Sequence, residues 1–220
     1  MKKLLYTLLI LFVITGCGSQ KINSGSKLIE AKNEMLKNLD SFNFNATMVT
    51  KTGIANITTT MNCTENRTKK LIYCKTSTIG TTTEQYMDYG NHVVYTKVDT
   101  LVSKDSKWSK EKYESKNTNE WLNISDYVFN LEETEKNNGT LFKGTVDSNI
   151  LAKAASKSDS SIDLSKVISK DIEIEIFVNS QKYIETMSYT MNVLGLDQTV
   201  EIEFTDFNSA KNIELPSELK

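Results

Sequence analysis

Residues 172–204 read IEIEIFVNSQKYIETMSYTMNVLGLDQTVEIEF, and this stretch decides the fold. Apolar residues alternate with glutamate in its first and last parts, and turns are expected at 179–182 and 195–197. An apolar residue at every second position is typical of a strand with one buried face and one solvated face. The stretch therefore predicts three consecutive antiparallel strands.

The same alternation occurs earlier in the chain. Short alternating segments between Phe42 and Val98 are separated by Gly53, by the polar run 64–70, by Gly80 and by Gly90-Asn91. Turn residues at such spacing predict an antiparallel meander. A further strand is expected near Trp108 and Tyr113, and another at 141–146.

Helical spacing appears in four places. Leu28, Ala31, Met35 and Leu39 recur at steps of three and four residues, which predicts a helix from Ser26. A second helix is predicted at 119–131, with apolar positions on one broad face. Shorter helical segments are expected around 150–154 and 162–168. The final Asn212-Ile213-Glu214-Leu215-Pro216 suits an edge or a terminus. The predicted helices are taken to cover the apolar face of the strands.

The N-terminus has the organisation of an export signal. Lys2 and Lys3 precede the apolar run Leu4 to Ile14, which is too short to span a bilayer. The run ends in Thr15-Gly16-Cys17, and this end resembles the lipobox of bacterial lipoproteins. The resemblance implies that residues 1–16 are a signal peptide and that Cys17 carries a diacylglyceryl group. Two acyl chains would give a lasting membrane anchor. A conventional signal peptide ending at Cys17, or an uncleaved anchor, is the alternative.

Composition restricts the remainder of the chain. Residues 17–26 are expected to be the lipidated cysteine and a flexible tether, and 27–220 a single domain. Hydrophobic residues are 39%, charged residues 25% and the mean hydropathy is −0.37, which is typical of a globular body. The formal net charge is −2, and removal of Lys2 and Lys3 would take it to about −4, which argues against a nucleic-acid partner.

The order of lipobox, polar tether, amphipathic helix, meander, helical interruption and further antiparallel strands resembles exported lipoproteins of the LolA, LppX and LprG type. This resemblance covers Lys27 to Leu219 and rests on pattern alone. It implies an α+β fold: a strongly curved antiparallel sheet, forming an open half-barrel, with helices packed in its concave mouth. Members of the family bind or carry lipids or lipidated molecules between sheet and helices.

One set of side chains could line such a ligand cavity, because thioethers and aromatic rings adapt to apolar guests. The candidates are Phe42, Phe44, Met48, Met61, Met87, Tyr89, Met187, Tyr189, Met191, Ile202 and Phe204. The alternative is that they are ordinary core residues packed under the helices.

Cys63 and Cys74 are expected to form a disulfide. A hairpin with loop residues 67–70 places them directly opposite each other, and an exported location permits oxidation. Two free thiols are the alternative. No suitably placed histidines or further cysteines complete a zinc set.

Catalytic patterns are weak. His92 is the only histidine and lies beside a predicted turn, and the sequence has neither a Gly-x-Ser-x-Gly elbow nor a phosphate-binding loop. The glutamates of 172–204 fall on solvated faces. We therefore expect a non-enzymatic protein without cofactor or metal.

Two hypotheses follow. The first is a monomeric lipoprotein, anchored through Cys17 at the extracytoplasmic face of the cell membrane, that binds a lipid or other amphiphile. The second is a surface interaction or sensor lipoprotein with a filled core, acting through Trp108, Tyr113 and the loops around Lys104 to Lys116.

Overall fold

The structure is a computed structural model that describes residues 26–103, 106–112, 128–147, 171–193 and 195–219. The chain divides into two compact units. The first unit comprises residues 1–37 and 117–199, and the second comprises 38–116 and 200–220. Each unit is described by itself below.

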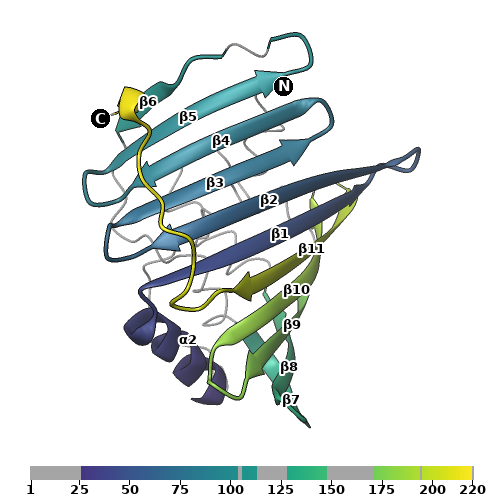
Figure 1. The fold of residues 1–220 in the computed structure, drawn as a ribbon. Coiled ribbons are helices and arrows are strands. Elements are labelled where there is room, and N and C mark those ends of the chain that lie inside the picture. The colour runs from purple at the N-terminus through teal and green to yellow at the C-terminus, as the bar shows by residue number, and fades with distance from the viewer. Residues whose placement is uncertain (1–25, 104–105, 113–127, 148–170, 194, 220) are drawn as a thin grey trace. The chain divides into compact units, whose positions relative to one another are not determined.

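The described strands belong to one sheet with the hydrogen-bonded order β6-β5-β4-β3-β2-β1-β11-β10-β9-β8-β7. The registers given below are antiparallel, and no pairing among the described strands joins β6 to β7, so the sheet is not closed into a barrel. An unclosed antiparallel sheet accompanied by a helix is the predicted fold class (Figure 1).

The second unit contains the predicted meander. Its strands are β1 (Ser41–Lys51), β2 (Asn56–Asn66), β3 (Leu71–Thr78), β4 (Thr81–Asp88), β5 (Val93–Thr100) and β6 (Ser109–Lys112). Each strand pairs with the next in an unbroken register, as in Phe44↔Cys63, Cys63↔Cys74 and Cys74↔Gln85. Since side chains alternate across a strand, residues that face each other in register lie on one face of the sheet.

The first unit contains β7 (Val128–Lys136), β8 (Gly139–Val146), β9 (Ile172–Asn179) and β10 (Ile184–Val193). β11 (Leu196–Thr205) begins in the first unit and ends in the second. Ile172, Ile174, Ile176 and Val178 are at most 7% exposed, which confirms the period-two pattern of the opening stretch.

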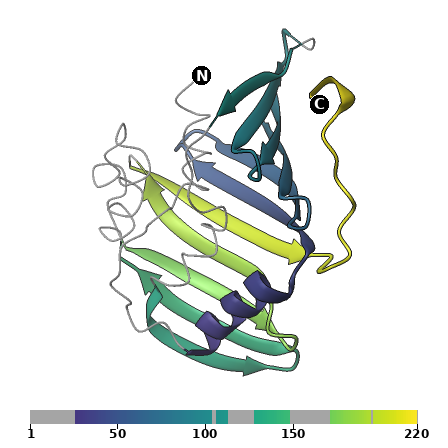
Figure 2. The same cartoon turned by 90° about the vertical axis from the view of Figure 1, so that its left-hand side faces the viewer.

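The predicted N-terminal helix is α2 (Ser26–Asn38), and it packs on this unit. Lys27 Nζ lies 3.0 Å from carboxylate oxygens of both Glu133 and Glu135 on β7. Further along the helix, Met35 Sδ accepts a hydrogen bond of 3.2 Å from the backbone N–H of Ile184 on β10. The helix thus extends from β7 to β10, and its buried Leu28, Ala31 and Met35 supply apolar cover (Figure 2).

The helix predicted at 119–131 is wrong in its last part. Val128 and Leu131 belong to β7, and Val128 pairs with Val146. β7 lies at a sheet edge and most of it is exposed, so its polar run 132–136 shows no apolar alternation. Without that alternation, the helical spacing of the preceding apolar residues led to the wrong prediction for 128–131. A register shift between Phe129 and Glu132, with a positive φ of 52° at Asn130, also interrupts the strand.

The C-terminal tail, residues 206–219, runs along one face of the second unit (Figure 1). Asn208 fixes its beginning, since Oδ1 accepts from the Asp40 N–H at 2.7 Å and Nδ2 donates to the Asn38 carbonyl at 3.0 Å. Further along, Lys69 Nζ lies 3.2 Å from Glu214, and Trp108 Nε1 donates to Glu218 at 2.8 Å. Together these contacts connect the corner before β1 with the segment before β6.

Several predictions fall outside the described residues. These are the signal peptide, Cys17 and the tether, Tyr113, most of the helix at 119–131, and the helical segments around 150–154 and 162–168. Within the described parts, no helix has both the length and the apolar character needed to cross a bilayer.

Candidate functional site: the apolar face of the second unit

The apolar face of the second unit is the face that carries Phe42, Phe44 and Met48 of β1. Register places further residues on it in cross-strand rows. One row is Phe42, Glu65, Ile72, Met87 and Val94; the next is Phe44, Cys63, Cys74, Gln85 and Thr96; the third is Ala46, Met61, Thr76, Thr83 and Val98. Five of the predicted cavity residues, namely Phe42, Phe44, Met48, Met61 and Met87, therefore share this face.

An aromatic cluster forms its most buried part. Phe42, Phe44 and Phe204 are each at most 3% exposed, and their ring centroids are 6.2 to 6.3 Å apart. Such separations suit tilted and edge-on ring packing. Phe204 comes from β11, where Ile202 has the same strand parity and is half-buried. The cluster joins the two sequence-distant parts of the second unit.

Exposure increases from β1 and β2 toward β5. Met48 and Met61 are buried, whereas Met87, Gln85, Val94 and Val98 are half-buried. Polar groups among them are paired with one another, as in Gln85 Nε2 to Thr96 Oγ1 at 3.2 Å and Thr59 Oγ1 to Thr78 Oγ1 at 3.1 Å. This part of the face offers methyl and thioether groups interspersed with hydroxyls and an amide.

A buried carboxylate lies in the first row, and the sequence reasoning missed it. Glu65 is 1% exposed, and its Oε1 accepts from Arg67 Nε at 3.0 Å. Its other oxygen, Oε2, is buried and has no hydrogen-bond partner among the described residues. Burial raises the pKa of the Glu65 carboxyl, and the charge and hydrogen bond of Arg67 oppose that rise.

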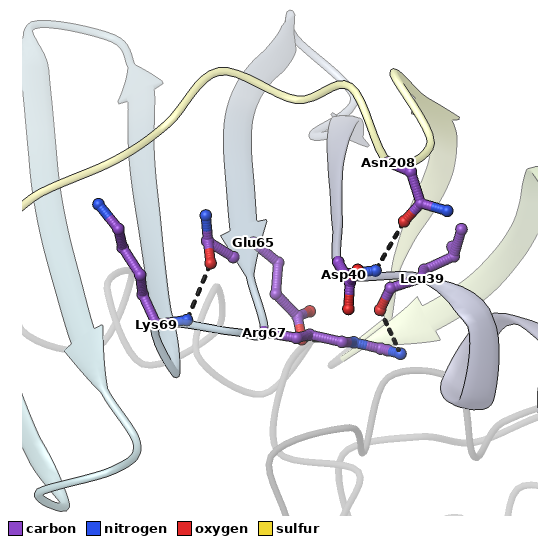
Figure 3. A network of polar contacts seen from close by, with 7 residues as sticks. Leu39, Asp40, Glu65, Arg67, Lys69 and Asn208 are labelled. Atoms are coloured by element: carbon purple, nitrogen blue, oxygen red, sulfur yellow. Dashed lines mark hydrogen bonds and ion pairs between the residues drawn. The ribbon is translucent and has the colours of Figure 1, made fainter.

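Arg67 connects this carboxylate to the corner between α2 and β1 (Figure 3). Its Nη1 donates to the Leu39 carbonyl at 3.4 Å, and its backbone N–H donates to the Asp40 carbonyl at 2.8 Å. The guanidinium carbon also lies 5.3 Å from the ring centroid of Phe42, a cation–π distance. The pair thus fixes the start of β1 at one end of the apolar face.

The disulfide prediction is confirmed. Cys63 and Cys74 are bonded and lie directly opposite each other in the β2–β3 register, with a Cα to Cα distance of 4.2 Å. The hairpin loop is Arg67 to Lys70, as expected from the sequence. The disulfide therefore cross-links two strands in the middle of the apolar face.

The remaining candidates are placed differently. Tyr89 lies in the turn after β4, where its N–H donates to the Lys70 carbonyl at 3.0 Å, and it is half-buried. Met187, Tyr189 and Met191 belong to β10 of the first unit. Met187 is 2% and Tyr189 6% exposed, and burial raises the pKa of the Tyr189 hydroxyl; Met191 is half-buried.

The opposite face of the second unit is polar and bears Trp108 of the interaction hypothesis, whereas Tyr113 lies outside the described residues. Trp108 packs on Tyr86 at 5.5 Å between ring centroids, and Tyr86 packs on Tyr73 at 4.7 Å. The Tyr73 hydroxyl donates to Glu84 at 2.8 Å. Because Trp108 also donates to Glu218, its ring and its N–H are both occupied by contacts within the chain.

Catalytic and metal-binding groups are sparse in what the structure describes. His92 is exposed in the β4–β5 turn, with a φ of 55°. Within the described ranges, no group of three or more His, Cys, Asp or Glu side chains is placed to hold a metal ion.

Comparison with solved structures gives a likeness over most of the chain. Lipoprotein LppX of Mycobacterium tuberculosis matches with a TM-score of 0.50 and 11% identity, over 85% of this chain and 96% of LppX. The chain has an LppX-like fold. The likeness at this identity concerns the fold alone.

Two further structures match less closely. A domain described as an outer membrane lipoprotein-sorting protein, from Vibrio parahaemolyticus, has a TM-score of 0.35 and 10% identity, over 86% of this chain and 93% of that one. A LolA superfamily protein from Nitrosomonas europaea has a TM-score of 0.31 and 9% identity, over 89% and 96%. No family model matches the sequence, and no curated protein does. The LppX-like fold thus rests on structure.

Proposed function

We propose that this protein is a non-enzymatic lipoprotein that binds a lipid or other amphiphile along the apolar face of the second unit. The LppX-like fold and the lipobox-like N-terminus support this proposal, since the resemblance noted above implies amphiphile binding beside the sheet. The acyl part of the ligand would contact Met48, Met61 and Met87. Its polar part would reach the hydroxyl and amide groups of β3 to β5.

The observation that carries the proposal is the exposure gradient on this face. Side chains at the centre of a packed core are inaccessible, whereas Met87, Gln85 and Val98 are half-buried although they share a face with the phenylalanine cluster. Thioether and methyl groups accept an irregular apolar chain at little cost. Nearby Thr96 and Gln85 can exchange their mutual hydrogen bond for one to a ligand headgroup.

The proposal includes attachment to the membrane through diacylglyceryl-Cys17, at the extracytoplasmic face, with the protein acting as a monomer. Nine Cα–Cα steps separate Cys17 from Ser26, so this tether extends to roughly 30 Å at most. The protein would then stay close to the bilayer from which an amphiphile is taken or to which it is given.

Ligand binding is tested by native mass spectrometry of the full protein purified from its membrane, with and without prior denaturation. We expect an adduct of lipid mass that denaturation releases, in addition to the covalent mass at Cys17. Met87→Arg should lose this adduct because it places a charge on the apolar face. Thr82→Arg is the matched control, since Thr82 is also half-buried on β4 but lies on the polar face. Equal adducts in the two folded variants would refute the proposed surface.

Anchoring is tested separately with Cys17→Ser. We expect the wild-type protein to fractionate with membranes and to resist extraction by salt and carbonate. The variant should lose the covalent lipid mass. If the wild type carries no acyl mass on Cys17, the anchor proposal fails whatever the outcome at Met87.

A further inference from the structure

The turns of the second unit differ between the two ends of the meander. In an antiparallel meander, alternate turns lie at the same end, so β1–β2, β3–β4 and β5–β6 share one end while β2–β3 and β4–β5 share the other (Figure 1). We call the first set the aliphatic tips, comprising residues 51–56, 78–81 and 100–103. The second set, residues 67–70 and 89–92, contains Arg67, Lys69, Lys70, Asn91 and His92.

Each aliphatic tip presents a large apolar side chain to solvent. Ile54 is 98% exposed on the first tip and Ile79 is 72% exposed on the second. On the third tip, Leu101 is 79% and Val102 96% exposed. Apart from Leu196 at 38%, these are the exposed large hydrophobic residues of the described chain. Aliphatic exposure is therefore concentrated at one end of one unit.

The tips are ordered turns. Thr52 closes the first tip, since its N–H and hydroxyl both donate to the Ala55 carbonyl, at 3.2 and 2.6 Å. The second and third tips are joined, because the Leu101 N–H donates to the Gly80 carbonyl at 3.0 Å and the Leu101 side chain packs against Gly80. Gly53 and Gly80 have φ values of 80° and 69°, which favour glycine at these turns. Backbone groups paired in this way can enter an apolar medium without an unsatisfied hydrogen bond.

The arrangement suits a lipid surface better than a protein partner. Neighbouring strands are about 4.8 Å apart, so tips separated by two strands lie roughly 10 Å from one another. The first tip stands apart from the joined second and third tips, and neither small contact has the area or the aromatic or arginine anchors of a protein interface. A bilayer accommodates separate protrusions because it is fluid. The ranges named above contain one charged residue, Lys51, and in the sequence the opposite charges Lys104 and Asp105 follow the third tip, so little net charge opposes contact with a headgroup layer.

We propose that the aliphatic tips insert into the headgroup and upper acyl region of the membrane and so dock the second unit on the bilayer. The inference goes beyond ligand binding and uses the proposed anchor at Cys17 in one respect: the tether keeps the protein as a whole at high effective concentration over lipid. Insertion of Ile54, Ile79 and Val102 would define which end of the meander faces the bilayer.

The test uses the full protein bound to vesicles of phosphatidylcholine and phosphatidylglycerol with brominated acyl chains, which quench nearby tryptophan. Ile54→Trp and Val102→Trp report the tips, and Asn91→Trp, in the β4–β5 turn, is the matched control at the other end. All three positions are exposed, so the fold should tolerate them. Emission of the wild type, with Trp108 and Trp121, is subtracted.

We expect the added emission of Ile54→Trp and Val102→Trp to shift to shorter wavelength and to lose most of its intensity in brominated vesicles. Asn91→Trp should keep the spectrum of a tryptophan in water. If the protein floats with vesicles and all three variants remain unquenched, the anchor stands and tip insertion is refuted. Equal quenching of Asn91→Trp would refute the assignment to this end, and absence of flotation would refute both anchoring and insertion.

Discussion

Both units contain strands in which every second residue is apolar and buried, but the apolar faces of the two units have different chemistry. In the first unit, β9 presents three isoleucines and a valine that are at most 7% exposed, beneath α2. In the second unit, the apolar face mixes phenylalanine and methionine with threonine, glutamine and a buried glutamate, and its exposure rises toward β5. The first face is a packed core. The second has the accessibility and mixed polarity that a ligand surface needs.

This comparison explains why an apolar stripe alone does not identify a binding surface. Met187 and Met87 both occur on alternating strands, and from sequence they are equivalent candidates. The structure distinguishes them by burial: Met187 is 2% exposed, whereas Met87 is half-buried. Methionine can serve either purpose, because a flexible thioether fills gaps in a core as readily as it accepts a guest.

The largest expected effect comes from placing the same charge on the apolar faces of both units. Met187→Arg should destabilise the protein by on the order of 3–5 kcal/mol, the cost of an uncompensated buried charge, and so largely unfold it. Met87→Arg should cost about 1 kcal/mol, since its side chain can reach water. Urea unfolding followed by circular dichroism measures both. Similar losses at the two sites would show that the faces do not differ in packing.

Removal of the disulfide should affect the second unit selectively. Cys63→Ala with Cys74→Ala opens a loop of about twelve residues, and the loop-closure model gives a loss of about 3 kcal/mol. Hydrogen exchange should show reduced protection in β2 and β3 and little change in β9 and β10. Reductant should reproduce this result in the wild type and have no effect on the double variant. Equal loss of protection in both units would mean that they unfold as one.

Glu65 gives the second unit a pH dependence of its own. Burial raises the pKa of this carboxyl in the folded state, so between the unfolded and folded pKa values the folded protein binds more protons. The free energy of unfolding of the wild type should therefore fall, relative to Glu65→Gln, as the pH rises from the unfolded pKa through the raised one. The direction of this change tests whether burial of the Glu65 carboxyl outweighs its pairing with Arg67.

Unfolding curves of the two proteins at several pH values measure this difference. A wild type that gains stability over Glu65→Gln with rising pH would show that attraction to Arg67 outweighs burial.

The smallest expected effect is a pH dependence of stability at Glu135 in the first unit, and its sign is opposite to that at Glu65. A hydrogen bond from Lys27 lowers the pKa of the exposed Glu135 carboxyl. The contribution of this hydrogen bond to stability is present above the pKa that Glu135 has in the unfolded chain. It disappears as the pH falls through the lowered pKa of the folded state. Glu135→Gln should therefore be slightly less stable than the wild type near neutral pH and equal to it in acid. Thermal unfolding at both pH values checks this, with Lys27→Met as the partner control.

Much of the fold could be predicted because its strands obey a simple rule. The alternation in 172–204 and between Phe42 and Val98 predicted β1 to β5 and β9 to β11, and a four-residue loop was enough to pair Cys63 with Cys74. β7 could not be found in this way, because an edge strand exposed on both faces needs no alternation. Helical spacing before it extended the predicted helix over Val128 and Leu131.

Two features of the second unit were missed for local reasons. Glu65 lies in a polar run, so the sequence analysis did not recognise that it alternates with Met61 and Cys63 on the apolar face of β2. Burial of a carboxylate depends on Arg67 and on the corner at Leu39, which sequence spacing does not reveal. Ile54 and Ile79 adjoin Gly53 and Gly80, and an aliphatic residue beside a turn glycine was the available signal for the tips.

The two compact units are each built from two separate segments of the chain, and this constrains when each unit can fold. The second unit needs residues 200–220. Phe204 must arrive before the phenylalanine cluster can close, and Asn208 before the corner at Asp40 is fixed. Because Phe204 and Asn208 follow β6 by about ninety residues in the sequence, the meander is an incomplete sheet with an unpaired edge at β1 until they are present. A truncation that removes only the final twenty residues should therefore be recognised by quality control as an unfinished protein.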